Sequence, residues 1–172
     1  MAVDVLYSGQ EPEAQLPGDP EENLWNFKQG QHVAYEPEYL DIHVGMRLVL
    51  TRNIDKARGF VNGMGCVVRT MRRHGLEVLT DQQQALVVYP YTDVHHWPDG
   101  SYSKVTFFPI RLGYATTLHK VQGATLDHAT IWLDVANIEA AGYVALSRVR
   151  TDADWQFVGQ LTTHHFTPAS DV

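Results

Sequence analysis

The chain of 172 residues is 44% hydrophobic and 19% charged, which fits one globular domain or two small ones with a sizeable buried core. No run approaches the roughly 18 apolar residues of a membrane span, and no signal-peptide pattern opens the chain, so we expect no membrane partner. The single cysteine, Cys66, has no internal disulfide partner. We therefore expect an intracellular, reducing compartment: the nucleus or a mitochondrion in a eukaryote, and the cytoplasm otherwise.

Charge is distributed unevenly along the chain, whose net charge is −7. Residues 1–45 carry nine acids and one base, whereas residues 46–172 are close to neutral. Residues 47–73 contain seven bases against a single acid, Asp55, which gives this segment a charge of +6. A basic segment attracts phosphates even in an acidic chain, but the same composition also suits a solvated face of a barrel.

The first part of the chain predicts disorder followed by short strands. Residues 9–23 combine three prolines and two glycines with several acids, so we expect a disordered acidic N-terminal stretch. Tyr91, Trp97 and Tyr102 fall in a Pro- and Gly-containing loop, where aromatic side chains either pack over a barrel or stack on bases. The predicted strands favour a small barrel or curled sheet and cover residues 46–50, 66–71, 76–79, 85–89 and 105–108. Residues 72–75 are expected to form a hairpin turn between the second and third of these strands.

From Pro109 onward the pattern becomes α/β. Residues 113–120 lead into a helix-like segment, and residues 138–147 have helical spacing. Residues 130–133 and 155–158 are typical of strands. The order strand, helix, strand predicts a fragment of a parallel sheet.

Two polar clusters in apolar surroundings carry the chemistry of the chain. The first occupies residues 117–123, and the second is Ser147-Arg148 at the end of an apolar run. Lys120 supplies a point charge for phosphate, Arg148 a rigid fork for phosphate oxygens, and Gly123 room for a ligand to approach the backbone. Taken singly, each cluster also suits a helix terminus in solvent.

Taken together, the two clusters resemble motifs V and VI of superfamily-one DNA helicases of the petite-integration-frequency (PIF) and RecD type. Residues 44–53, 60–67 and 108–117 resemble the segments that precede motif V in these enzymes. The similarity covers roughly residues 35–160, and its blocks follow one another in the family's order. The resemblance implies an ATP-dependent 5′-to-3′ DNA helicase, with roles in DNA repair, DNA recombination and telomere maintenance.

The resemblance also implies an architecture. We expect a mixed α/β fold, with a partial RecA-like parallel sheet and an inserted small SH3-like β-barrel. The expected domains are an acidic linker or tail of a preceding domain (1–40), the small barrel (41–110, the helicase 2B domain), the C-terminal end of the second RecA-like domain (111–162, 2A) and a tail (163–172).

Site residues follow from the same resemblance. Arg148 is the expected arginine finger. Gln122 is expected to be catalytic and, with Gly123 and Arg148, to bind the nucleotide. The expected contacts to single-stranded DNA are Thr117, His119, Lys120, Arg52, Asn62, Arg69 and Arg72. Two positions depart from the family pattern: Val121 stands where a small polar residue is common, and Gly142 where a glutamine often precedes the tyrosine.

A P-loop is missing from the sequence. The chain contains no Gly-Lys dipeptide and no acidic pair after an apolar strand that would hold a metal ion. We therefore expect ATP and Mg²⁺ to bind only with a P-loop domain from a longer chain or a separate protein, and we expect no ATP hydrolysis by this chain alone. Two other hypotheses stay open: a stand-alone module that binds single-stranded nucleic acid, and a nonfunctional truncated helicase.

Other residue types predict little chemistry. Cys66 and the histidine pairs at 95–96 and 164–165 lack the spacing of metal ligands, so we expect no metal site. The serines have no nucleophile-elbow context that would favour a hydrolase.

Overall fold

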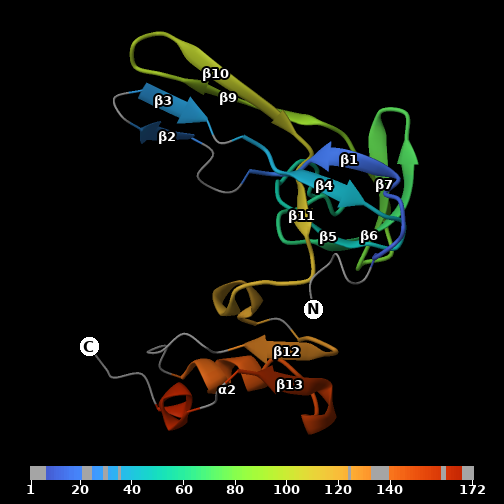
Figure 1. Ribbon diagram of the computed structural model, residues 1–172, viewed down its shortest axis with the longest axis vertical. Helices are drawn as coiled ribbons and strands as arrows, with labels where there is room; N and C mark the ends of the chain where they lie inside the picture. The colour runs from blue at the N-terminus through green and yellow to red at the C-terminus, as the bar shows by residue number, and fades with distance from the viewer. Residues whose placement is uncertain are drawn as a thin grey trace. The chain divides into compact units, whose positions relative to one another are not determined.

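The computed structural model describes residues 7–20, 25–28, 31–34, 36–123, 125–132, 140–159 and 162–167. The chain divides into two compact units, residues 1–114 and 115–172. Strands dominate the described residues, and the one α-helix among them, α2 (Ala141–Leu146), is short (Figure 1). No helix in this part of the chain is long and apolar enough to cross a membrane. The fold is thus mostly β, where the sequence predicted a more even α/β mixture.

An antiparallel sheet forms the centre of the first unit. Its order is β11-β5-β6-β7-β8: Ile110–Leu112, Arg47–Leu50, Gly65–Arg72, Gly75–Thr80 and Ala85–Val88. Successive side chains of a strand point to opposite faces, so Leu76 and Val78 of β7 are fully buried while Glu77 between them is not. The structure confirms four of the five predicted strands as members of this sheet. Closure into a barrel stays a prediction.

The fifth predicted strand belongs to a hairpin outside this sheet. β10 (Tyr102–Phe107) pairs along its full length with β9 (Tyr91–His96), so the predicted loop is wrong for Tyr91 and Tyr102. One face of this hairpin is exposed, so it lacks the apolar alternation that would have revealed it. The fifth place in the central sheet goes to β11, which pairs with β5. The domain boundaries expected at residues 40, 110 and 162 stay predictions.

The described residues of the acidic N-terminal stretch are part of the fold. β1 (Ala14–Pro17) pairs with β4 (Tyr39–Ile42), and β2 (Trp25–Lys28) pairs with β3 (Gln31–Ala34). Leu16 lies in the core, and the Gly18 and Asp19 amides bond to the Glu38 and Ile110 carbonyls. The predicted disorder is therefore wrong for β1: one apolar side chain and several long-range backbone bonds offset the unfavourable composition.

A β-bulge at Arg69 decides which residues of β6 face solvent. The β6–β7 register runs from Val68 opposite Val78 to Thr70 opposite Glu77, which leaves Arg69 as the extra residue. Val68 is buried and Met71 packs against the core, while Arg69, Thr70 and Arg72 are exposed. The bulge therefore shifts the alternation by one residue and keeps both arginines on the outer face.

The second unit pairs two strands in parallel. β12 (Ala129–Trp132) lies beside β13 (Trp155–Val158), as the predicted parallel-sheet fragment requires (Figure 1). Leu133 and Ile138, also assigned to predicted elements, lie outside the described residues. Ala140 has φ +58, a left-handed conformation that does not continue a helix, so α2 begins at Ala141. Membership of a RecA-like sheet stays a prediction. Short 3₁₀ helices complete the unit: η1 (Leu118–Val121), η2 (Asp152–Asp154) and η3 (Thr163–Phe166).

Candidate nucleotide and nucleic-acid sites

The first polar cluster lies on and around η1. The Lys120 amide donates to the Thr117 carbonyl at 3.0 Å, which closes the turn. The side chains of Thr117, Lys120 and Gln122 are exposed, whereas the side chain of His119 lies outside the described part. Gly123 has φ +80, and no atom lies within 4 Å of the position that a Cβ would take. The segment therefore ends in an open backbone position that a ligand can approach.

The second cluster ends α2 with an oriented guanidinium. Arg148 Nε donates to the Val144 carbonyl at 3.1 Å, and Arg148 Nη2 donates to Ser147 Oγ at 2.9 Å. Ser147 Oγ in turn donates to the same Val144 carbonyl at 2.9 Å. The C-terminal end of a helix favours a cation because its last carbonyls point outward. These bonds hold the half-buried Arg148 side chain in one direction.

Backbone contacts bring the two clusters into the same part of the second unit. η1 contacts α2 directly. The Leu126 amide donates to the Arg148 carbonyl at 2.7 Å, and Leu126 and Val149 form a parallel bridge. Residues 117–123 and Arg148, predicted to act together, are thus linked within one small unit.

The two departures from the family pattern have structural reasons. A Cβ at Gly142 would lie 2.6 Å from Cε1 of Phe166, so the ring of Phe166 occupies the space beside this glycine. Because Phe166 belongs to η3, the predicted C-terminal tail packs against α2. Val121 is half-buried at the end of η1, where an apolar side chain fits.

Arg52, a predicted DNA contact in the first unit, already has a structural role. Its guanidinium pairs with Asp19 at 2.8 Å and lies 5.3 Å from the centre of the Phe107 ring. The Asp19 side chain is 3% exposed and accepts a 2.5 Å hydrogen bond from Thr51 Oγ1. A DNA contact by Arg52 stays a prediction, and it would compete with this buried pair.

The other predicted DNA contacts of the first unit are exposed. Asn62 lies in a turn where its amide donates to Asn53 Oδ1 at 3.0 Å. Arg69 occupies the bulge of β6. Arg72 is paired with Glu77 of the neighbouring strand, through a 2.5 Å hydrogen bond from Nε to Oε2. Their DNA contacts stay predictions.

The residues considered for a metal site have other surroundings. The ring of His95 lies 4.2 Å from Trp97 and 5.5 Å from Trp25. His165 is buried and bonds to Thr162. Burial of the Cys66 thiol raises its pKa to about 12, which disfavours the thiolate that metals bind. Among the described residues no group of three or more His, Cys, Asp or Glu is placed to hold a metal ion.

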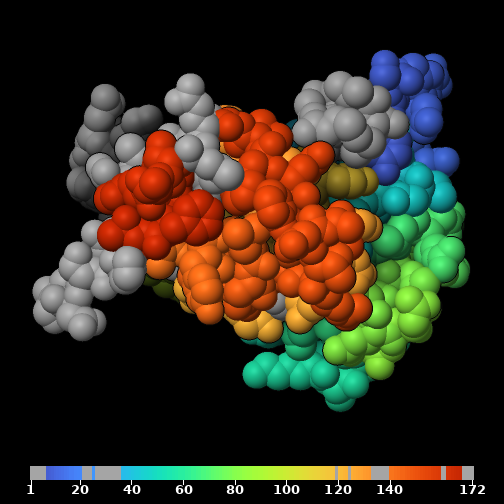
Figure 2. Space-filling view, turned by 90° about the horizontal axis from the view of Figure 1, so that it is seen from below, coloured from blue at the N-terminus to red at the C-terminus, as the bar shows by residue number. Residues whose placement is uncertain are grey.

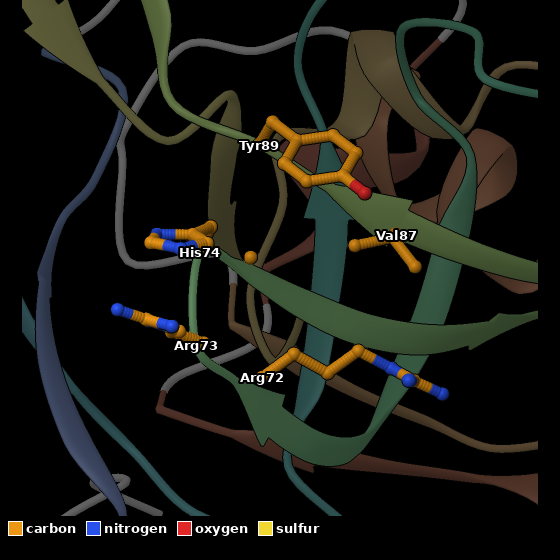
Figure 3. A pocket seen from close by; sticks show the side chains of 6 residues that line it. Arg72, Arg73, His74, Val87 and Tyr89 are labelled. Carbon is orange, nitrogen blue, oxygen red and sulfur yellow. The ribbon is translucent and has the colours of Figure 1, made fainter.

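A shallow hollow at the end of the β6–β7 hairpin was not predicted. It is lined by Arg72, Arg73, His74, Gly75, Val87 and Tyr89 (Figure 3). The sequence predicted the turn at residues 72–75 but did not connect it with Tyr89. Sheet order makes the connection, because β8 lies beside β7 with Val88 opposite Leu76. An exposed tyrosine at a strand end, followed by a proline, was the available signal.

Comparison with known proteins shows similarity to part of several DNA helicases. The ATP-dependent DNA helicase Pif1 of Bdellovibrio bacteriovorus is 29% identical over 162 residues, covering 92% of this chain and 33% of the relative. The ATP-dependent DNA helicase PIF1 of Danio rerio is 35% identical over 118 residues, 65% of this chain and 18% of the relative. The crystal structure of Pif1 from Bacteroides with ADP-AlF3 and ssDNA matches with a TM-score of 0.63 and 27% identity, covering 84% of this chain and 35% of that one.

No family model matches the chain. The relatives nevertheless define its class, because the chain is homologous to part of ATP-dependent DNA helicases. More particularly, it is homologous to a segment of the Pif1-family DNA helicases, which confirms the resemblance of its motifs. The chain spans about a third or less of the length of these relatives.

Proposed function

We propose that the chain supplies the arginine finger and part of the single-stranded DNA track of an ATP-dependent 5′-to-3′ helicase of the PIF/RecD type. The observation that carries the proposal is the oriented guanidinium of Arg148, linked through its own carbonyl to the segment that follows residues 117–123. The Bacteroides relative binds ADP-AlF3 and ssDNA. Action in DNA repair, recombination or telomere maintenance, inside the cell, belongs to the same proposal.

The nucleotide side of the proposal rests on Arg148, Gln122 and Gly123. ATP, when bound, supplies the phosphoryl group whose transfer drives translocation. A fixed guanidinium stabilises the negative charge that develops on the γ-phosphate. Gly123 lets the backbone approach the nucleotide, and the amide of Gln122 can both donate and accept a hydrogen bond. In this proposal ATP binds between two domains. The P-loop and the ligands of Mg²⁺ belong to the other one, a P-loop partner domain.

The DNA side of the proposal uses both units. Thr117, His119 and Lys120 of the second unit would contact the DNA backbone. Hydroxyl and ammonium groups at such positions fix a strand without reading its sequence. In the first unit the proposed contacts are Asn62, Arg69 and Arg72, on a barrel of the 2B type. Arg52 is a further proposed contact, but it would first have to leave its ion pair with Asp19.

A reconstitution assay tests the arginine finger. The chain alone should show no DNA-stimulated ATP hydrolysis, and activity should appear when the P-loop domain of the Bdellovibrio relative is added. Arg148→Ala should then lower kcat by a factor of about 10³ or more. Arg150→Ala is the matched control, because Arg150 lies two residues away, is exposed and should leave kcat unchanged. Full activity with Arg148→Ala would refute the assignment, and turnover by the chain alone would refute the need for a partner.

A second candidate is a module that binds single-stranded nucleic acid without motor activity. The exposed arginines on the outer face of β6 favour it. Binding should then weaken as salt rises, because phosphate contacts release counterions. Strong binding by the isolated chain, with no ATP hydrolysis after a P-loop domain is added, would favour this candidate over the motor.

A further inference from the structure

We infer that the turn of the β6–β7 hairpin and Tyr89 form a nucleotide-binding subsite for single-stranded DNA. In this subsite the ring of Tyr89 stacks on a base and Arg73 holds a neighbouring phosphate. The inference rests on the proposed DNA-binding function and adds a location and a stacking residue to it.

Tyr89 is placed against the turn by a glycine. A Cβ at Gly75 would lie 3.1 Å from Cδ1 of Tyr89 and only 2.8 Å from Cγ1 of Val87 and the carbonyl of Val88. A glycine therefore lets β8 and the tyrosine ring approach the end of the hairpin. The Tyr89 side chain is nevertheless 59% exposed. A tyrosine that only sealed the hairpin would bury its ring, whereas a stacking platform keeps one face open.

Charge around the ring has one sign. The hollow is lined by three basic side chains and no acidic one. Arg72 is engaged by Glu77 and extends to the opposite side from Arg73 and His74 (Figure 3). Among the described residues Arg73 has no ion-pair partner, so its guanidinium can bind a phosphate without giving up an existing ion pair. Arg69, also exposed, lies on β6, the strand that leads into this turn.

The combination of an open aromatic ring and a cation is what single-stranded nucleic acid requires. Each base has a flat face that stacks on an aromatic side chain, and each nucleotide carries a phosphate one backbone step away. A duplex would offer phosphates but no free base face, so Tyr89 would contribute nothing to it. The structure thus favours an unpaired strand over a duplex at this hollow.

Fluorescence anisotropy with the full chain and a labelled oligothymidylate tests the subsite. Tyr89→Ala should weaken binding by about 5-fold or more without changing the dependence on salt, because stacking involves no counterion. Tyr89→Phe should bind like the unmodified chain. Arg73→Ala should reduce the slope of log K against log salt by about 0.7, the value for one phosphate of a single strand. Tyr39→Ala is the control, because Tyr39 is 71% exposed on β4, in the same unit.

An abasic oligonucleotide of equal length tests stacking without any substitution in the protein. The unmodified chain should bind it about 5-fold or more weakly than oligothymidylate, and Tyr89→Ala should lose this preference. Binding that is the same for both oligonucleotides would overturn the subsite and leave the proposed function standing. A failure of the unmodified chain to bind any oligonucleotide at low salt would overturn both the subsite and the DNA-binding part of the proposed function, whereas the arginine finger has its own test. An equal loss with Tyr89→Phe and Tyr89→Ala would overturn stacking, because the hydroxyl would then be responsible.

Discussion

The two units differ in how they bury apolar surface. The first unit packs the inner faces of its strands into one continuous core, into which the N-terminal segment also inserts. In the second unit, by contrast, Trp132 and Val158 lie opposite each other on the parallel strands and are 70% and 51% exposed. Parallel strands in proteins are normally covered on both faces. The surface of this unit is coloured orange to red in Figure 2. The first unit is therefore stabilised by its own apolar core, whereas the second unit leaves large apolar side chains of its parallel strands exposed.

Truncation of a core residue should separate the two units most strongly. Leu48→Ala in the first unit should lower the free energy of unfolding by about 3 kcal/mol, because Leu48 is fully buried and its removal leaves a cavity. Trp132→Ala removes a larger side chain from the second unit, yet should cost less than about 1 kcal/mol. Urea unfolding curves of both variants measure these values. Equal losses would show that the contrast between the units is wrong.

The buried ion pair at the N-terminal segment gives the next largest effect. Asp19→Ala should cost about 2 to 3 kcal/mol, because it leaves Thr51 and Arg52 without their shared acceptor. Glu13→Ala, an exposed acid in the same segment, should change stability by less than about 0.5 kcal/mol. Thermal unfolding of the two variants distinguishes a structural acidic segment from a disordered one, for which both changes would be neutral.

Alkaline pH should weaken the first unit through Cys66. Burial raises the pKa of this thiol from 9.0 to about 12, so above pH 9 the unfolded chain releases a proton that the folded chain retains. Stability is unaffected below pH 9 and should fall by about 1 to 2 kcal/mol by about pH 10. Tyr7, whose pKa is raised to about 12 by burial and by its bond to Tyr114, adds to the decline at higher pH. Cys66→Ala should unfold with a shallower pH dependence; an unchanged slope would contradict the assignment.

The contact between Gly142 and Phe166 gives the smallest effect. Gly142→Ala should change stability by less than about 0.5 kcal/mol, because the gain in helix propensity offsets the displacement of the ring. In a Phe166→Ala background the same change should stabilise α2 by about 0.5 to 1 kcal/mol. Hydrogen exchange at the amides of α2 measures both values. Additive effects of the two substitutions would show that the ring does not constrain this position.

Local signals in the sequence were sufficient for much of the fold. Four of the five strands of the central sheet follow from apolar alternation and the turn at residues 72–75, and the parallel pair follows from the order of its elements. Pairings between distant segments were not available from such signals. β11 joins β5, and the acid of residue 19 meets Thr51, only because the chain returns to the same place after many residues. Composition alone therefore predicted disorder for a segment that tertiary contacts order.

The candidate site residues also differ in whether the sequence alone could reveal them. Residues 117–123 and Arg148 could be found from sequence because their spacing resembles a known pair of motifs, and backbone bonds then link them. The proposed subsite at Tyr89 could not be found in this way, because Tyr89 and the turn at residues 72–75 come together only through the pairing of β7 and β8.

The bulge at Arg69 has a consequence for insertions and deletions in β6. Side chains of a strand alternate between its two faces, and the single extra residue shifts this alternation between Val68 and Met71. Deletion of Arg69 would return the strand to strict alternation, and Val68 and Met71 would still be packed while Thr70 and Arg72 would still be exposed. Both a substitution and a deletion are therefore tolerable at residue 69, whereas deletion of the regularly paired Val67 would turn Val68 toward solvent.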